Sequence, residues 1–199
     1  RARLVGSEMC IRDRYRGYDS AGIATLNNGN LGRRRSLGKL AELSDLLVRD
    51  PLLGKSGIGH TRWATHGKPS VNNAHPHMTA EVAVVHNGII ENFQELREYL
   101  QKRGIQHTTD TDTETIALLT QAMIEDGHEP IEAAKKTIDK LTGAFALCFL
   151  FEGHNDLMVI ARKGSPLAIG IGKGEMFVGS DAIALSCLLY TSPSPRDEL

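Results

Sequence analysis

Short apolar runs rich in β-branched and aromatic residues alternate with glycine and other turn formers, early in the chain and again towards its end. Runs of this length and composition predict β-strands. The segment from Gly22 to Gly38 turns at Asn28-Gly29, which predicts a β-hairpin. Five further strands are predicted, over residues 56–65, 81–88, 144–151, 157–163 and 175–179.

The middle of the chain instead has apolar residues three and four positions apart, which is the period of a helix. One helix is predicted over about 92–103, with Gly104 ending it. A second begins near Asp112 and ends before Gly127. A third begins at residues 129–130, where a proline suits the first helical turn. Its predicted apolar stripe is Ile131, Ala134, Ile138 and Leu141.

The order of these elements predicts the fold class. Strands come first, helices follow, and strands return, which favours a layered α+β domain over a parallel βαβ array. A chain of 199 residues is long enough for one domain with a sizeable core, or for two small ones.

Composition excludes several classes of partner. The formal net charge is -1, with both signs interspersed, so nothing favours binding to nucleic acid or to an anionic membrane. No apolar run reaches the length of a membrane span or a signal peptide. Three cysteines without a paired spacing suit the reducing cytoplasm. The one dense basic run, residues 33–35, is interpreted as a solvated hairpin edge, with a phosphate site as the alternative.

The two ends of the chain are related to each other through one DNA sequence. Residues 4–13 back-translate as CTC GTG GGC TCG GAG ATG TGT ATA AGA GAC. With AG added, the reverse complement read from its second base encodes Cys-Leu-Leu-Tyr-Thr-Ser-Pro-Ser-Pro-Arg, which is residues 187–196. This element resembles a transposase adapter of sequencing libraries; a genuine tail at each end is the alternative. We therefore expect 1–14 and 187–199 to be adapter-like artefacts around a domain fragment over 15–186.

Several side chains in the middle of the chain suit a small polar ligand. The guanidinium of Arg62 can hold a carboxylate by two parallel hydrogen bonds, or form a surface ion pair. Asn87-Gly88 offers an amide and an unhindered backbone N–H to an oxyanion, or forms a plain turn. Asp112 can bind an ammonium group or cap a helix. Trp63 can line a pocket or fill the core.

A carboxylate clamp, an ammonium acceptor and an oxyanion hole together describe a site for an α-amino acid whose side-chain carbonyl is attacked. The motifs that surround these residues, in chain order, are YRGYDSAG, HTRWATHG, NAHPH, HNGIIEN, TDTE, RKGSPL and GSD. Over nearly all of residues 15–185 they resemble the N-terminal glutaminase domain of the class II glutamine amidotransferases. HTRWATHG, NAHPH and HNGIIEN favour the branch that makes glucosamine 6-phosphate over those that make phosphoribosylamine or asparagine.

The resemblance implies a fold and a set of site residues. The fold is of N-terminal-nucleophile hydrolase type, an α+β domain with two antiparallel sheets sandwiched between helix layers, and its first strand is missing here. The implied catalytic residues are Asn87 and Gly88, which form the oxyanion hole. The implied substrate-binding residues are Arg62 for the α-carboxylate of glutamine, Thr65 and His66 nearby, Asp112 for the α-amino group, Trp63 in the pocket, and Arg16 near the nucleophile.

The similar enzymes use an N-terminal cysteine, whose thiolate attacks the side-chain amide while its own α-amine handles the proton. Here Met9-Cys10 is followed almost at once by the Tyr15 block, without the intervening glycine, strand and helix of the pattern. We therefore expect that Cys10 is not the nucleophile and that the chain as written is inactive. Cys187 falls in the other adapter-like stretch, and Cys148 is expected to be a small buried hydrophobe.

In the similar enzymes ammonia passes to a sugar-isomerase region, which is missing here, and converts fructose 6-phosphate into glucosamine 6-phosphate. The resemblance implies glutamine as the substrate of this domain, no cofactor, no metal, and a cytoplasmic, homo-oligomeric parent enzyme. The alternatives are a non-catalytic glutamine-binding module, another class II amidotransferase, and a metallohydrolase. Eight histidines would supply ligands to the last, although their spacing is not that of a zinc site.

Overall fold

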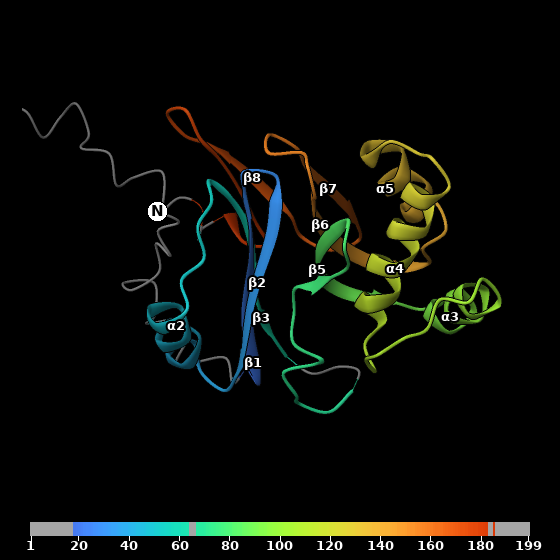
Figure 1. The fold of residues 1–199 in the computed structure, drawn as a ribbon, viewed down its shortest axis with the longest axis horizontal. Helices are drawn as coiled ribbons and strands as arrows, with labels where there is room; N and C mark the ends of the chain where they lie inside the picture. The colour runs from blue at the N-terminus through green and yellow to red at the C-terminus, as the bar shows by residue number, and fades with distance from the viewer. Residues whose placement is uncertain (1–17, 64–66, 183–184, 186–199) are drawn as a thin grey trace, which may run out of the picture.

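Two antiparallel sheets lie face to face between layers of helices (Figure 1). This computed structural model describes residues 18–63, 67–182 and 185. The first sheet has the order β2-β1-β3 and consists of β1 (Ser20–Asn27), β2 (Asn30–Leu37) and β3 (Ser56–Arg62). The second has the order β4-β5-β6-β7 and consists of β4 (His77–Met78), β5 (Val82–Ile90), β6 (Gly143–Phe151) and β7 (Met158–Lys163).

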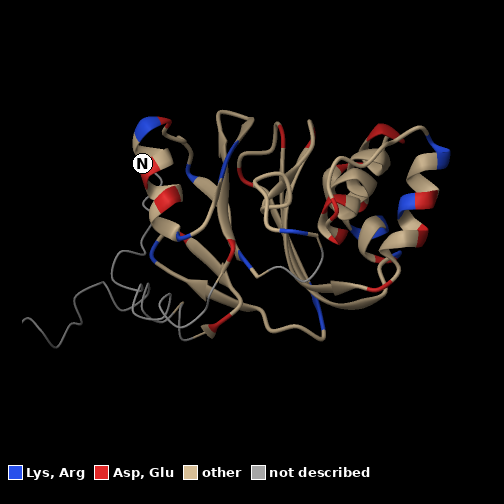
Figure 2. Ribbon diagram, turned by 90° about the horizontal axis from the view of Figure 1, so that it is seen from below, with Lys and Arg blue, Asp and Glu red and all other residues tan. Residues whose placement is uncertain are grey.

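Helices cover the outer face of each sheet. The first sheet is covered by α2 (Leu40–Arg49), which contacts β1 and β2. The second is covered by a helical layer of α3 (Phe93–Lys102), α4 (Asp112–Glu125) and α5 (Pro130–Ile138). Figure 2 shows acidic and basic residues interspersed along these outer helices. A separate ribbon pairs β8 (Ala168–Ile171) with β9 (Met176–Gly179).

The strand β6 supplies two hydrophobic cores at once, because successive side chains of a strand point to opposite faces. Phe145, Leu147 and Phe149 belong to the core between the second sheet and the helices. Cys148 and Leu150 belong to the core between the two sheets, together with side chains of β1, β3 and β5. Burial on both faces explains why this strand is apolar at every position rather than at alternate ones.

The predicted hairpin is present, with the two-residue loop Asn28-Gly29 between β1 and β2. Both loop residues have positive φ, 51° and 87°, as a tight hairpin turn that matches the strand twist requires. On its other side β1 pairs with β3. The hairpin therefore gives the first sheet its central strand and one of its edges.

The α+β class and the predicted strands and helices are confirmed, with some corrections. Sequence patterns did not indicate α2, although its leucines recur at helical spacing, and they did not indicate β4 or β8. The stripe predicted for α5 is wrong at Ile131, which is 61% exposed, whereas Ala134 is buried.

Within the described ranges, no helix is both long enough and apolar enough to cross a membrane.

Candidate active site

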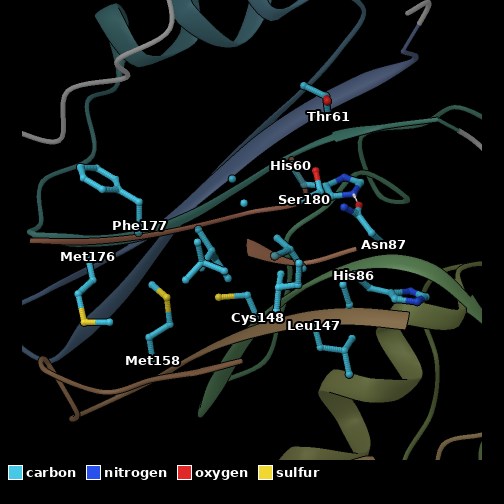
Figure 3. A pocket seen from close by; sticks show the side chains of 18 residues that line it. His60, Thr61, His86, Asn87, Leu147, Cys148, Met158, Met176, Phe177 and Ser180 are labelled. Atoms are coloured by element: carbon cyan, nitrogen blue, oxygen red, sulfur yellow. Dashed lines mark hydrogen bonds between the residues drawn. The ribbon is translucent and has the colours of Figure 1, made fainter. Parts of the chain in front are cut away.

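A cleft of about 440 Å³ opens between the two sheets and the β9 strand (Figure 3). Its floor is apolar and includes Cys148 and Met158. Its polar lining includes His60 from β3, Asn87 from β5 and Ser180, which follows β9. Residues from distant parts of the chain thus meet where the two sheets face each other.

Asn87 is held from the opposite sheet. Its side-chain oxygen Oδ1 lies 2.7 Å from Nε2 of His60, the bond drawn as a dashed line in Figure 3. Asn87 is itself exposed and lies within β5, directly opposite Ala146 of β6. The alternative interpretation of Asn87-Gly88 as a plain turn is therefore wrong, because both residues belong to a strand.

Gly88 lies where the backbones of β5 and β6 come close together. Its φ is +121°, a region that side chains disfavour. A Cβ atom placed here would lie 2.1 Å from the carbonyl oxygen of Ala144. Only glycine fits this position without a shift of β6.

A group of three histidine rings lies beside Asn87. The centroids of His60 and His75 are 4.3 Å apart, and those of His75 and His77 are 5.0 Å apart. Nε2 of His77 lies 2.9 Å from Oγ1 of Thr111 at the start of α4. We call His60, His75 and His77 the histidine cluster. From the sequence these three histidines were considered only as metal ligands, and their contact with Asn87 was not predicted, because the residues come together only in the folded chain.

The histidine cluster is uncharged at neutral pH. Burial lowers the pKa of His60 to about 4 and that of His77 to about 3, and lowers the pKa of His75 well below 6.5. The charges of Arg35 and Arg33 lower the pKa of His77 further, and Arg62 and neighbouring histidines lower the pKa of all three rings. Each ring therefore carries a single N–H.

Asp112 is buried at the first turn of α4. Its Oδ2 accepts a hydrogen bond of 3.0 Å from the backbone N–H of Ile90, and Nδ1 of His86 lies 3.7 Å from the same oxygen. The helix-cap alternative for Asp112 is wrong, because the N-cap is Thr111, whose hydroxyl accepts from the Glu114 N–H. The carboxylate of Asp112 joins β5 to the helical layer instead.

Arg62 is buried at the end of β3, with 3% of its surface exposed. Its Nη1 lies 3.2 Å from the Asp19 carboxylate, and its Nη2 donates to the carbonyl of Gly67 over 2.9 Å. The alternative of a surface ion pair is therefore wrong. The next residue, Trp63, is 63% exposed, which excludes a role in filling the core.

The basic run on β2 holds the loop that carries His75. Nη1 of Arg35 donates to the carbonyls of Asn72 and Ala74, each over 2.8 Å. Arg33 donates to the carbonyl of Pro76 over 3.1 Å. The predicted edge is confirmed for the described sheet, but Arg33 and Arg35 are half-buried loop anchors rather than solvated side chains.

Some of the predicted site residues lie close together in the structure, and others are not among the described residues. Asn87 connects through His60 and His75 to Thr113, the neighbour of Asp112. The remaining candidates Arg16, Thr65 and His66, and also Cys10 and Cys187, lie outside the described residues.

Cys148, the cysteine within the described ranges, is 7% exposed. Burial raises the pKa of its thiol to about 12, which keeps it protonated at neutral pH and makes it a poor nucleophile. The structure agrees with its predicted place in the core. Within residues 18–63, 67–182 and 185, no three His, Cys, Asp or Glu side chains are grouped to hold a metal ion.

Two solved structures share this arrangement of sheets and helices. Glutamine phosphoribosylpyrophosphate amidotransferase from B. subtilis, complexed with ADP and GMP, superposes with a TM-score of 0.72 and 28% identity, over 85% of this chain and 37% of that chain. The allosteric regulatory enzyme of purine biosynthesis superposes with a TM-score of 0.74 and 27% identity, over 87% of this chain and 38% of that one. The domain is therefore of the N-terminal-nucleophile hydrolase type, as predicted.

The chain belongs to the glutamine amidotransferase domain family, whose sequence profile matches residues 60–187. Curated relatives are named glutamine–fructose-6-phosphate aminotransferase (isomerizing). The one from Bradyrhizobium diazoefficiens is 62% identical over 86% of this chain and 28% of its own length. That from Zymomonas mobilis is 55% identical over 87% of this chain and 29% of its own length. The chain thus spans less than a third of these relatives, and is homologous to their glutamine amidotransferase domain.

Proposed function

We propose that this domain binds L-glutamine and releases its amide nitrogen, as part of an enzyme that transfers that nitrogen to fructose 6-phosphate and forms glucosamine 6-phosphate. The observation that carries the proposal is Asn87, an exposed strand amide that lines the cleft and is hydrogen-bonded from the opposite sheet. The names of the curated relatives support the choice of acceptor.

In the proposed mechanism each end of glutamine has its own partner. The buried guanidinium of Arg62 holds the α-carboxylate, and the carboxylate of Asp112 takes the α-ammonium group. Thr65, His66 and Trp63 are the further residues that we propose for glutamine binding. A thiolate supplied by the parent enzyme attacks the side-chain amide carbon.

The attack turns the carbonyl oxygen of the amide into an oxyanion. Nδ2 of Asn87 and the backbone N–H of Gly88 donate to that oxygen and stabilise its charge as it develops. The α-amine of the nucleophilic cysteine passes a proton to the amide nitrogen, which leaves as ammonia. The remaining acyl-enzyme is then hydrolysed by water to glutamate. Arg16 lies close to the nucleophile in this scheme.

Further proposals concern the parent enzyme. The acceptor sugar binds in a region outside this chain, and the parent is a cytoplasmic homo-oligomer. The stretches 1–14 and 187–199 are adapter-like sequence and belong neither to the domain nor to the rest of the parent enzyme.

A second candidate function is glutamine binding without hydrolysis by the chain as written. The buried, protonated thiol of Cys148 favours it, since this group cannot serve as the nucleophile.

Titration calorimetry with modified ligands tests the proposal without any mutation. L-glutamine is expected to bind, whereas its methyl ester, which lacks the carboxylate charge, and N-acetylglutamine, which lacks the ammonium charge, should each bind at least about tenfold more weakly. D-glutamine is the matched control for stereochemistry. Equal affinity for all four compounds, or no heat of binding with L-glutamine, would contradict the proposal.

A further inference from the structure

We propose that His60 is a positioning residue that sets the direction of the Asn87 amide, so that both N–H groups of Asn87 face the cleft. The inference rests on the proposed function, in which those N–H groups stabilise an oxyanion. An amide has two chemically different ends, and a strand backbone alone does not decide which end faces the cleft. The structure supplies the missing constraint from the other sheet.

The contact is short and comes from a different layer of the fold. Nε2 of His60, on β3, lies 2.7 Å from Oδ1 of Asn87, on β5 (Figure 3). The opposite ring nitrogen, Nδ1 of His60, is buried and has no hydrogen-bond partner among the described residues. The ring also packs against His75, with centroids 4.3 Å apart, which limits its rotation.

These contacts assign the ring proton. The imidazole of His60 is neutral at pH 7, because burial lowers its pKa to about 4. Its single N–H can sit on either nitrogen. On Nδ1 it would be a buried donor without an acceptor, which is unfavourable. On Nε2 it donates to Oδ1 of Asn87, so the Nε2–H tautomer is preferred.

The charges around the ring keep it in this neutral state. The charges of Arg62, on the same strand, and of His86, on β5, disfavour a proton on His60. The interactions of the ring with the Asn87 side chain and with the backbone of His86 favour a proton, but they are too weak to offset burial. The adjoining ring of His75 is itself neutral. His60 therefore donates from Nε2 to Oδ1 of Asn87 at pH values well above 4.

The direction of the amide matters for the chemistry. With Oδ1 bound to His60, Nδ2 points away from the ring and offers its hydrogens to a ligand oxygen. A reversed amide would present Oδ1, a lone-pair acceptor, to the developing negative charge and would repel it. His60 acts on the reaction only through Asn87, so it is not itself a catalytic residue.

The first test is spectroscopic and uses the unmodified chain. Long-range ¹H–¹⁵N correlation spectra of the imidazole rings at pH 7 distinguish the two neutral tautomers of His60. We expect Nε2 to carry the proton and to keep it as the pH is lowered to 5. A proton on Nδ1 would overturn the inference, whatever the outcome of the binding measurements.

The second test is rescue by a conservative variant. His60→Leu removes the donor and should weaken L-glutamine binding about 3- to 10-fold, whereas His60→Gln, which places an amide N–H near the position of Nε2, should recover most of the affinity. His128→Leu, in the turn between α4 and α5 and not among the residues that line the cleft, is the matched control and should bind like the unmodified chain.

The outcomes separate the two proposals. Failure of the unmodified chain to bind L-glutamine would contradict the proposed function, while the tautomer still decides the role of His60. Binding by folded His60→Leu equal to that of the unmodified chain would overturn the positioning role. Should His60→Leu not fold, as judged by circular dichroism, the tautomer measurement and the affinity of His60→Gln decide.

Discussion

His75 and Thr113 form a buried hydrogen bond of 2.7 Å between Nε2 of the ring and the hydroxyl Oγ1 on the first turn of α4. The same hydroxyl lies 3.1 Å from Nδ1 of His86, on β5. Thr113 is fully buried, so no water replaces a lost bond from outside. One hydroxyl therefore links the loop, the second sheet and the helical layer.

Removal of that hydroxyl should destabilise the domain. Thr113→Val keeps the shape of the side chain but removes the hydrogen bond to the buried Nε2 of His75, so we expect a loss of about 1–3 kcal/mol in the free energy of unfolding. Thr113→Ser, which keeps the hydroxyl, should recover most of it. Urea denaturation followed by circular dichroism measures both, and equal stability of the valine and serine variants would show that the bonds contribute nothing.

The histidine cluster should make the fold sensitive to acid. The folded-state pKa values of His60, about 4, and His77, about 3, lie below the unfolded value of about 6.5. A group with a lowered folded pKa contributes stability that is present above the unfolded pKa and is lost as the pH falls through the folded pKa. Stability should therefore fall between pH 6.5 and 3, by about 1.4 kcal/mol per pH unit for each histidine that binds a proton only on unfolding.

Urea midpoints measured between pH 7 and 5 isolate this effect, because most carboxylates remain ionised there. His77→Gln should reduce the slope of stability against pH by about one proton. Unchanged stability over this range would mean that the histidines titrate normally in the folded chain.

Gly88 should not tolerate a side chain. Alanine at this position would have a strained φ of +121° and a Cβ atom 2.1 Å from a backbone oxygen, so Gly88→Ala should cost about 2–4 kcal/mol. Gly104, which ends α3, has a φ of +82° and nothing within 4 Å of its Cβ position. Gly104→Ala is the matched control and should cost only about 1 kcal/mol. Thermal unfolding of the two variants compares them, and equal losses would contradict the close approach of β5 and β6.

Cys148 should react slowly with thiol reagents in the folded chain. Its thiol is 7% exposed and burial raises its pKa to about 12, so at pH 8 almost none is thiolate. Labelling with iodoacetamide, followed by mass spectrometry of the peptide that contains Cys148, should show little modification in buffer and complete modification in urea. Equally fast labelling under both conditions would mean that the sheet-to-sheet core is open.

The pattern of apolar residues was sufficient to predict most of the described strands and helices and the α+β class. Those elements bury one or both faces, and the spacing of their apolar residues matches the period of a helix or a strand. Phe149 and Leu150 belong to different cores because neighbouring residues of a strand point to opposite faces of the sheet. The helix α2 was not predicted, although Leu43 is buried as a helical period requires.

The candidate site was predictable only in part, because local patterns carry residue types but not distances. The motifs indicated Arg62, Asn87 and Asp112 one by one, each with a competing interpretation. Pairing of β5 with β6 places Asn87 in a strand. Packing of β3 against β5 brings His60 within hydrogen-bond distance of it. The folded chain buries Arg62 and leaves Trp63 exposed, which the sequence had left open.

The sequence by itself determined the periodicity of the elements, the order of the motifs and therefore the family. Tertiary structure decided which polar groups share one cleft and whether each histidine of the cluster is protonated at neutral pH. The histidine cluster shows the reason, since its rings come from β3, a loop and β4 and meet only when the two sheets pack. Their low pKa values follow from that burial, a property of the folded chain that no local run of residues contains.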